Sequence, residues 1–210
     1  MCIRDRGKPR QSMARQARET RWELQKDRML RAAARCFNEK GYSGSSLKDV
    51  AAILGLTDAA LYYYVRNKEE LVYLCYLRAG DVGREALERA IAEGSNGLDT
   101  VRRYLRYHVA AMTGEDGPVA IMSEIPSLQP EHRDRILDIS RRHSARFEDV
   151  LKSGIEDGSI VPCDVRMTGN AIMGALNWVP KWFRGDADVA AQVVAEFPTI
   201  LSAGLAASGR

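Results

Sequence analysis

The feature that most constrains the fold is a pair of short helical segments that meet at Gly55. The first begins at Ser46, an N-cap residue with Asp49 three positions later, and its apolar face ends after about two turns at Gly55. Thr57 is placed to cap the second segment, which extends to about Val65. Small and apolar side chains fill the joint between the two segments: Val50, Ala51, Leu54, Leu56 and Leu61. Two short helices joined by such a turn fit a helix-turn-helix.

Helical periodicity also continues through the rest of the chain. The expected helices, each bounded by capping residues or by Gly and Pro, span residues 22–40, 67–93, 98–112, 131–157, 164–184 and 187–206, with a shorter apolar piece at 119–125. No alternation of apolar and polar residues is long enough for a sheet. The sequence therefore predicts an all-α fold of about nine helices.

The charge is distributed unevenly along the chain. Residues 1–70 hold 15 Lys and Arg against 9 Asp and Glu, whereas residues 71–210 hold 16 against 19. A basic N-terminal part on an acidic body indicates a polyanionic partner for the first part, although a solvated basic tail would have the same charge. Residues 1–21 lack a hydrophobic period and contain Gly7 and Pro9, so we expect them to form a flexible basic arm.

Three consecutive tyrosines follow the turn in the stretch LTDAALYYYVRNKEEL. On a helical wheel, Tyr64 and Val65 fall on the same face as Leu61, whereas Tyr63 falls nearly opposite and Tyr62 falls on the flank. Tyr64 is therefore expected to pack inward with its ring, while Tyr62 and Tyr63 face outward. Outward tyrosines can simply decorate a helix exterior, so their position alone does not indicate a function.

The helix-turn-helix context suggests a function for this surface, because the second helix of the motif enters the DNA major groove. Small side chains at Ala59 and Ala60 permit close approach to the bases and contact with a thymine methyl group. The tyrosine hydroxyls and the free amides at the helix start near Thr57 can donate to phosphates. Lys48 and Lys68 add positive charge on either side.

The stretch from Arg28 to Tyr76, RMLRAAARCFNEKGYSGSSLKDVAAILGLTDAALYYYVRNKEELVYLCY, resembles the DNA-binding domain of TetR-family transcriptional regulators. The resemblance implies a three-helix DNA-binding head, a helical body that senses a ligand and dimerises, and usually repression. The DNA contacts that it implies are Ser46, Lys48, Thr57, Asp58, Ala59, Ala60, Tyr62, Tyr63, Tyr64 and Lys68. Asp58 and Ala59 depart from the cation and glycine of many relatives, and Asp58 would repel phosphate unless it caps the helix or accepts from a cytosine. Val65 replaces the usual aromatic residue.

The resemblance divides the chain into the arm at 1–21, a helix-turn-helix DNA-binding domain at 22–70, and a ligand-binding and dimerisation domain at 71–210. It further implies that residues 164–206, the last two helices, form a homodimer through a four-helix bundle. Such a dimer would bind a palindromic operator with half-sites about one helical turn or more apart.

Candidate ligand contacts are the aromatic, methionine and isolated polar residues on the helices that should surround a pocket. They are Tyr104, Tyr107, His108, Met112, Met122, Phe147, Met173, Asn177 and Trp178. Most such residues are core fillers, but polar groups on apolar faces, as at His108 and Asn177, need partners. The segment GALNWVPKWFRGD is similar to regulators of the family that sense acyl-CoA thioesters. An acyl-CoA effector would require an arginine near the pocket mouth, for which Arg102, Arg103 and Arg106 are the candidates.

No motif of an enzyme is present: the chain lacks GxSxG, HExxH and a phosphate-binding glycine loop, and its three histidines are isolated. We expect no catalytic residues, no cofactor and no metal site, since the four cysteines form no CxxC pair. No long apolar run or signal peptide is recognisable, so a cytoplasmic location is expected. The alternative function is a structural or nucleoid-associated DNA-binding protein whose body binds a protein partner. A closed apolar cavity would favour the ligand-sensing regulator.

Overall fold

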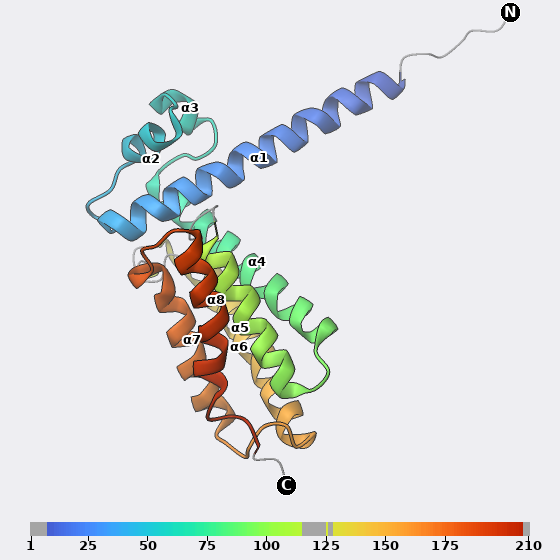
Figure 1. Cartoon of the computed structure of the whole chain (residues 1–210). Coiled ribbons are helices and arrows are strands. Elements are labelled where there is room, and N and C mark those ends of the chain that lie inside the picture. The colour runs from blue at the N-terminus through green and yellow to red at the C-terminus, as the bar shows by residue number, and fades with distance from the viewer. Residues whose placement is uncertain (1–7, 115–124, 126–127, 208–210) are drawn as a thin grey trace, which may run out of the picture.

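The computed structural model describes residues 8–114, 125 and 128–207, and within the first helix it describes side chains at residue 20 and from residue 22 onward. This part of the chain is all-α, as predicted, and contains eight helices (Figure 1). They are α1 (Lys8–Lys40), α2 (Leu47–Leu54), α3 (Asp58–Tyr62), α4 (Lys68–Glu93), α5 (Gly97–Thr113), α6 (Pro130–Glu156), α7 (Val165–Trp182) and α8 (Ala187–Ser202). The additional short segment expected at 119–125 lies outside the described residues, apart from its last residue.

The first helix is longer than its apolar period indicated. It begins at Lys8 rather than at Trp22, so the expected start of the first helix at residue 22 is wrong, and the part of the predicted flexible arm from Lys8 onward belongs to α1. Residues 8–21 contain four Arg, two Gln and two Ala, which favour helix without any apolar stripe, and Pro9 is tolerated in a first turn. Helix propensity therefore extends α1 beyond the head, and Figure 1 shows it projecting away from the other helices.

The two short helices of the head are fixed by their caps. The Ser46 side chain accepts from the Asp49 amide and Asp49 returns a bond to the Ser46 amide, which completes a capping box at the start of α2. Gly55 ends α2 in the left-handed conformation with φ of 65°, where a side chain would be strained. Thr57 caps α3, which ends at Tyr62 rather than near Val65. The sequence predicted the turn correctly but overestimated the length of α3.

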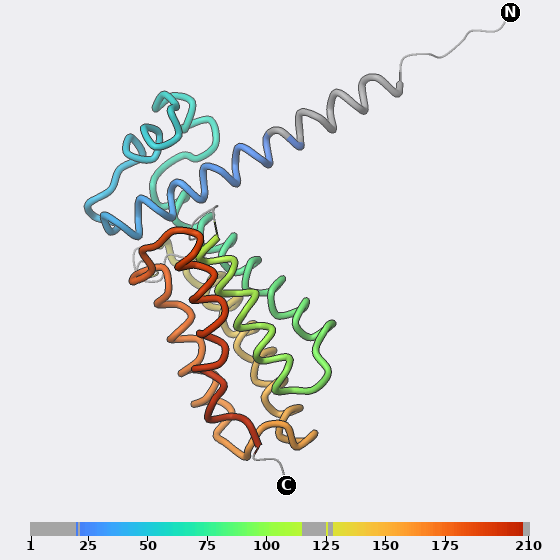
Figure 2. Tube along the Cα trace, in the orientation of Figure 1, coloured from blue at the N-terminus to red at the C-terminus, as the bar shows by residue number. Residues whose placement is uncertain are grey.

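Helices α4 to α8 form the body, in which α5 packs against α4, α6, α7 and α8 (Figures 1 and 2). Its main core gathers buried side chains such as Leu87, Tyr104, Phe147 and Leu176. A separate core, which includes Phe37 of α1, joins α1, α2, α3, the first half of α4 and Ile136 of α6. Because α4 contributes to both cores, it connects the head to the body. None of the described helices is both long and apolar enough to cross a membrane.

The start of α5 crosses the end of α6 at very close range. A Cβ atom added to Gly97 would lie only 2.2 Å from the Cα atom of Gly154, so only glycine allows this approach. The backbone amides at the start of α5 donate to side chains of the loop that follows α6. Gly97 donates to Asp157 at 2.8 Å and Leu98 to Ser159 at 3.0 Å.

Candidate DNA-binding surface and ligand cavity

The three tyrosines at the end of α3 and directly after it divide as the helical wheel predicted. Tyr62 is 57% exposed and Tyr63 is 76% exposed, whereas Leu61 and Val65 are buried. Tyr64 is partly buried and its ring lies 6.4 Å from that of Trp22 on α1. The outward surface of α3 therefore consists of two tyrosines beside Ala59, which is also exposed. The small side chain of Ala59 leaves the backbone of α3 accessible to a partner that presents a groove, and the two tyrosines lie beside it.

The predicted DNA contacts around α3 differ in their exposure and in whether their side chains already form hydrogen bonds. Lys48, Thr57 and Asp58 are exposed, and Ala60 is partly buried. The Thr57 hydroxyl oxygen already accepts from the Ala60 amide at 3.2 Å. Ser46 is exposed too, but its hydroxyl donates to Asp49 Oδ2 at 2.6 Å while capping α2. The capping role thus occupies the hydroxyls of both Ser46 and Thr57.

Asp49 is the centre of this capping arrangement. Its carboxylate accepts from Lys40 Nζ at 2.6 Å as well as from Ser46. The hydrogen bond from Lys40, followed by those from Ser46, lowers the pKa of Asp49 to about 2. The carboxylate therefore stays ionised and keeps the start of α2 tied to the end of α1.

Lys68 has a different position from the one predicted for a phosphate contact. Its ammonium donates to the Ser45 carbonyl at 2.7 Å and to the Tyr42 carbonyl, and it lies 4.1 Å from the centre of the Tyr42 ring. The start of α4 abuts the turn between α1 and α2, so the side chain reaches into the head instead of toward solvent. Lys68 is therefore placed to hold the α1–α2 turn against α4, and its contact with phosphate stays a prediction.

Four of the predicted ligand contacts come together in the body. His108 and Met112 of α5 and Met173 and Asn177 of α7 line a cavity of about 130 Å³ that also borders α4 and α6. Its other walls are largely apolar and come from Tyr76, Ala79, Gly80, Gly83, Ile125, Ile136, Ile139, Ser140, His143 and Ser144. Apolar walls with a few polar groups are typical of a small-molecule site.

The remaining predicted ligand contacts do not line this cavity. Tyr104 and Phe147 are fully buried core residues with ring centres 5.1 Å apart. Tyr107 lies on the opposite side of α5, where Arg89 covers its ring and its hydroxyl donates to Glu93. Trp178 is 60% exposed on α7 and does not line the cavity. Apolar residues surround most of α7, so their pattern did not indicate which side faces the cavity. Met122 lies outside the described residues.

A cluster of two histidines and a tyrosine lies at the cavity wall. His143 Nε2 and the Tyr104 hydroxyl are 2.8 Å apart. Both ring nitrogens of His108 are buried without a hydrogen-bond partner among the described residues. Gly83 of α4 makes room for the rings, since a Cβ there would lie 3.3 Å from His108 Cε1 and 3.6 Å from His143 Cε1. The sequence indicated His108 but missed His143, which lies among charged residues of α6 and has no apolar pattern around it.

Burial of His108 predicts a pH-dependent stability. Desolvation, assisted by the neighbouring His143, lowers the pKa of His108 to about 3 from an ordinary value of 6.5. Below pH 6.5 His108 binds a proton in the unfolded chain but remains neutral in the folded protein. The free energy of unfolding therefore falls as the pH falls. The loss from this group is about 2 kcal/mol between about pH 7 and about pH 5.

Urea denaturation of the wild type and of His108→Phe at both pH values measures this effect. The variant is expected to lose about 2 kcal/mol less than the wild type on acidification. His143, whose pKa burial also lowers, contributes a loss of the same sign to both proteins. Equal losses in the two proteins would show that His108 is not buried in its neutral form.

A basic groove of about 500 Å³ lies between α4 and α6, outside the cavity. Gly80, Ile139 and His143 line both hollows and so separate them. The groove carries four arginines and two acids: Arg84, Arg135, Arg142, Arg146, Asp81 and Glu88. Three of these arginines form ion pairs with carboxylates nearby, whereas Arg135 forms none with any residue that the structure describes. Four guanidinium groups at one groove suit an anionic ligand.

The arginines that the sequence suggested lie elsewhere. Arg102 donates to Ser202 at 3.0 Å and Arg103 to Asp99 at 2.8 Å, and neither they nor Arg106 line the cavity or the groove. Arg135, Arg142 and Arg146 are spaced by seven and four residues, which places them on one face of α6. That spacing is a signal in the sequence that could have identified them.

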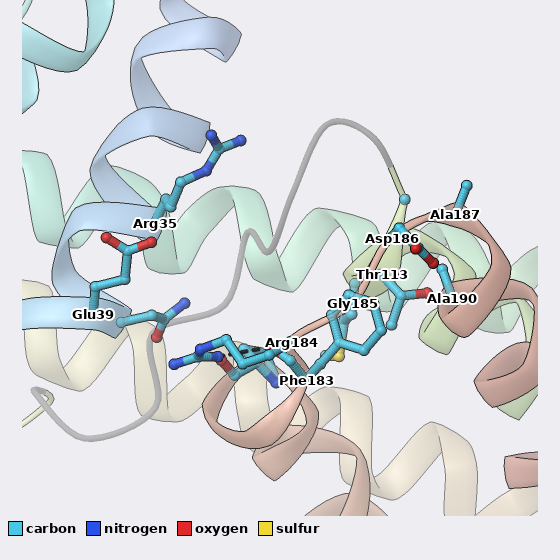
Figure 3. Close-up of a pocket in the computed structure, with 13 residues that line it drawn as sticks. Arg35, Glu39, Thr113, Phe183, Arg184, Gly185, Asp186, Ala187 and Ala190 are labelled. Carbon is cyan, nitrogen blue, oxygen red and sulfur yellow. Dashed lines mark hydrogen bonds between the residues drawn. The ribbon is translucent and has the colours of Figure 1, made fainter.

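A further groove of about 530 Å³ lies where the head meets the body (Figure 3). Arg35 and Glu39 of α1 line one side, and the turn from Phe183 to Ala187 lines the other. Met112 borders both this groove and the cavity. The cavity therefore lies close to the junction between head and body.

The start of α6 is attached to the first turns of α4. Glu69 Oε1 accepts from the Gln129 amide at 3.0 Å and lies 2.9 Å from His132 Nδ1. The ring of His132 stacks on that of Tyr73, with centres 3.8 Å apart and planes 6° apart. We call Glu69, Tyr73, Gln129 and His132 the α4–α6 latch. It joins α6 directly to the segment that carries Lys68.

The last two helices expose apolar side chains. Met167 and Trp178 of α7 and Ile200 of α8 are 66%, 60% and 66% exposed. Ala171 and Gly174 are also exposed and continue the stripe along α7 between Met167 and Trp178. A stripe of this kind on two adjacent helices is typical of a protein interface.

The fold and these sites define a helix-turn-helix DNA-binding regulator with a helical effector domain. Family comparisons agree: residues 29–73 match the model described as bacterial regulatory proteins, tetR family, and residues 84–202 match the tetracyclin repressor-like C-terminal domain. The second match alone covers more than half of the chain, which therefore belongs to the TetR family. It is a transcriptional repressor of that family and not an enzyme.

Several known proteins are similar over most of their length. The fatty acid metabolism regulator protein of Bacillus subtilis (strain 168) is 25% identical over 162 residues, covering 75% of this chain and 83% of that protein. The TetR family regulator PfmR from Thermus thermophilus is 33% identical with a TM-score of 0.71, covering 84% of this chain and 97% of that one. AibR, solved in complex with isovaleryl coenzyme A and operator DNA, has 24% identity and a TM-score of 0.67, covering 82% and 95%, and it shows the likeness of fold alone.

Proposed function

We propose that the chain is a homodimeric repressor that binds a palindromic operator through α3 and is released by a small acyl thioester of coenzyme A. The observation that carries the DNA-binding part is the outward pair Tyr62 and Tyr63 beside exposed Ala59, on a helix fixed by the Thr57 cap. In this arrangement Ala59 and Ala60 approach base edges, and the two tyrosines and Lys48 contact phosphates.

The contact set is smaller than the one that the resemblance implies. Tyr64 supports α3 because its ring packs against Trp22. Lys68 supports the head because it holds the α1–α2 turn. Ser46 offers a backbone amide and hydroxyl that already serve the capping box. Asp58 is exposed in the first turn of α3, where it favours the helix N-terminus.

Dimerisation is proposed through the exposed stripe on α7 together with the exposed side of α8. A two-fold axis brings the same surface of both copies together, so Trp178 and Ile200 would be buried by their counterparts. Burying aromatic and aliphatic side chains removes them from water, which supplies the driving force. The dimer would present two α3 helices to one face of the DNA.

The effector class rests on two adjoining hollows of different chemistry. The cavity offers apolar walls to an acyl chain, and the arginine groove offers guanidinium groups to the phosphates of coenzyme A. The names of two relatives, a fatty acid metabolism regulator and a protein bound to isovaleryl coenzyme A, support the same class. The cavity also favours ligand sensing over a purely structural role in which the body binds another protein.

The α4–α6 latch suggests how an effector would act on the head. A ligand that enters between α4 and α6 separates the helices that the latch joins, and α4 carries Lys68 against the α1–α2 turn. Moving α4 would shift the head and change the distance between the two α3 helices of a dimer. The operator would then be released by the effector, because only one separation fits both half-sites.

Selection of bound sequences from a random DNA pool, at near-physiological salt, tests the DNA-binding part. A palindrome is expected, and Tyr63→Ala should weaken its binding by roughly tenfold through loss of one contact. Tyr63→Phe is the matched control, since it keeps the ring and removes only the hydroxyl that donates to phosphate. A folded dimer that selects no motif, or a Tyr63→Ala variant with unchanged affinity, would argue against this surface.

A further inference from the structure

The cavity in the body is small for the ligand of a fatty acid regulator. Its volume is about 130 Å³, and it is bounded by α4, α5, α6 and α7. A dry apolar cavity of about 150 Å³ in a well-studied lysozyme variant is filled by benzene, which has about six heavy atoms. The present cavity therefore holds about five or six heavy atoms, and the rest of a long acyl chain would have to remain outside in water or move the cavity walls apart.

His108 is the polar residue of this cavity whose buried side-chain atoms have no hydrogen-bond partner among the described residues. Its side chain is 6% exposed, and neither ring nitrogen has a hydrogen-bond partner in the described part of the chain. Buried polar groups are almost always paired in native structures, so an orphaned imidazole at a cavity wall points to a partner supplied by a ligand. A neutral imidazole offers one N–H donor, which suits a carbonyl oxygen.

His108 lies next to a residue that separates the cavity from the arginine groove. Gly83 leaves space for its ring, and His143 next to it lines both the cavity and the arginine groove. The hydrogen bond between His143 and Tyr104 fixes that second imidazole. A ligand that places its coenzyme A moiety in the groove and its acyl group in the cavity would therefore lie beside the two histidines.

We propose that the cavity selects a short or branched acyl group of about six heavy atoms and that His108 donates a hydrogen bond to the oxygen of that group. The proposal rests on the acyl thioester function proposed above and adds the size of the acyl group and the residue that recognises it. An isovaleryl group has the required size, whereas a palmitoyl group greatly exceeds it.

Calorimetric titration of the purified full-length protein with coenzyme A and with its acetyl, isovaleryl, octanoyl and palmitoyl thioesters tests the size limit. Affinity is expected to rise from acetyl-CoA to isovaleryl-CoA. Palmitoyl-CoA is expected to bind at least roughly tenfold more weakly than isovaleryl-CoA, because overpacking the cavity is unfavourable. Tightest binding of palmitoyl-CoA would overturn the inference and leave the proposed effector class intact. Binding of none of the thioesters, with operator affinity unchanged by all of them, would overturn the effector class itself.

Two variants separate the two halves of the inference. His108→Phe keeps a ring of similar size without a donor and should weaken isovaleryl-CoA binding by roughly tenfold, with binding of coenzyme A alone unchanged. Met173→Ala enlarges the cavity and should shift the preference toward octanoyl-CoA. Unchanged isovaleryl-CoA affinity in His108→Phe would overturn the hydrogen bond, and an unchanged chain-length profile in Met173→Ala would overturn the size limit.

Discussion

Replacing Lys68 with alanine should destabilise the head and weaken binding to every DNA sequence. The ammonium donates to the carbonyls of Tyr42 and Ser45, and its removal takes a charged donor from both, although the Tyr42 carbonyl still accepts from the Ser45 hydroxyl at 3.0 Å. Hydrogen bonds from a charged group contribute about 1.5 to 3 kcal/mol, so a loss of about 2 kcal/mol in the free energy of unfolding is expected. Urea denaturation followed by circular dichroism gives the stability, and fluorescence anisotropy gives DNA affinity against salt.

Lys48 is the matched control, because it is an exposed lysine of the same domain with no ion pair among the described residues. Lys48→Ala should leave stability within about 0.5 kcal/mol of the wild type. It should lower the slope of log affinity against log salt by about one, as expected for the loss of one phosphate contact. If Lys68→Ala instead keeps full stability and changes only the salt slope, Lys68 is a phosphate contact and not a structural clamp.

A second large effect is expected from Gly97→Ala, at the crossing of α5 and α6. The added Cβ would lie 2.2 Å from the Cα and 2.5 Å from the amide nitrogen of Gly154. Backbone atoms cannot rotate away as a side chain can, so the start of α5 must move from α6 and lose its bonds to Asp157 and Ser159. We expect a loss of about 3 kcal/mol and a thermal midpoint roughly 6 to 12 °C lower, measured by calorimetry.

Gly169→Ala provides the comparison, since it also adds a methyl group at a buried glycine. A Cβ at Gly169 in α7 would lie 3.8 Å or more from its neighbours, which is ordinary van der Waals contact. The substitution should be neutral or stabilise the protein by up to about 1 kcal/mol, because alanine is the better helix former. Equal effects of the two substitutions would mean that α5 and α6 can separate at Gly97 without loss of stability.

The head could be predicted from the sequence almost residue by residue because its determinants are local. The capping box of Ser46 and Asp49 and the left-handed Gly55 depend only on neighbours a few positions away. The outward direction of Tyr63 likewise follows from the helical repeat. Apolar periodicity predicts only the part of α1 that packs against other helices. A helix that projects from the molecule does not need an apolar stripe, so the start of α1 was predicted wrongly.

The body was harder to predict because its sites combine residues far apart in the chain. His108 and Met173 were identified as cavity residues, but Trp178 and Tyr107 have the same residue types at similar spacing and face elsewhere. Helical periodicity gives the faces of one helix and does not say which neighbour covers each face. The arginines of the groove were missed for the same reason, since their role depends on α4 lying beside α6.

The sequence by itself determined the all-α class, the turn between α2 and α3, and the outward tyrosines, because caps, glycines and helical spacing act over a few residues. Only the tertiary structure decided that Lys68 holds the α1–α2 turn, that His108 is buried without a partner among the described residues, and that Gly97 must remain glycine. These properties depend on which surfaces of distant helices meet. That choice is made by the packing of the whole chain, so no single segment encodes it.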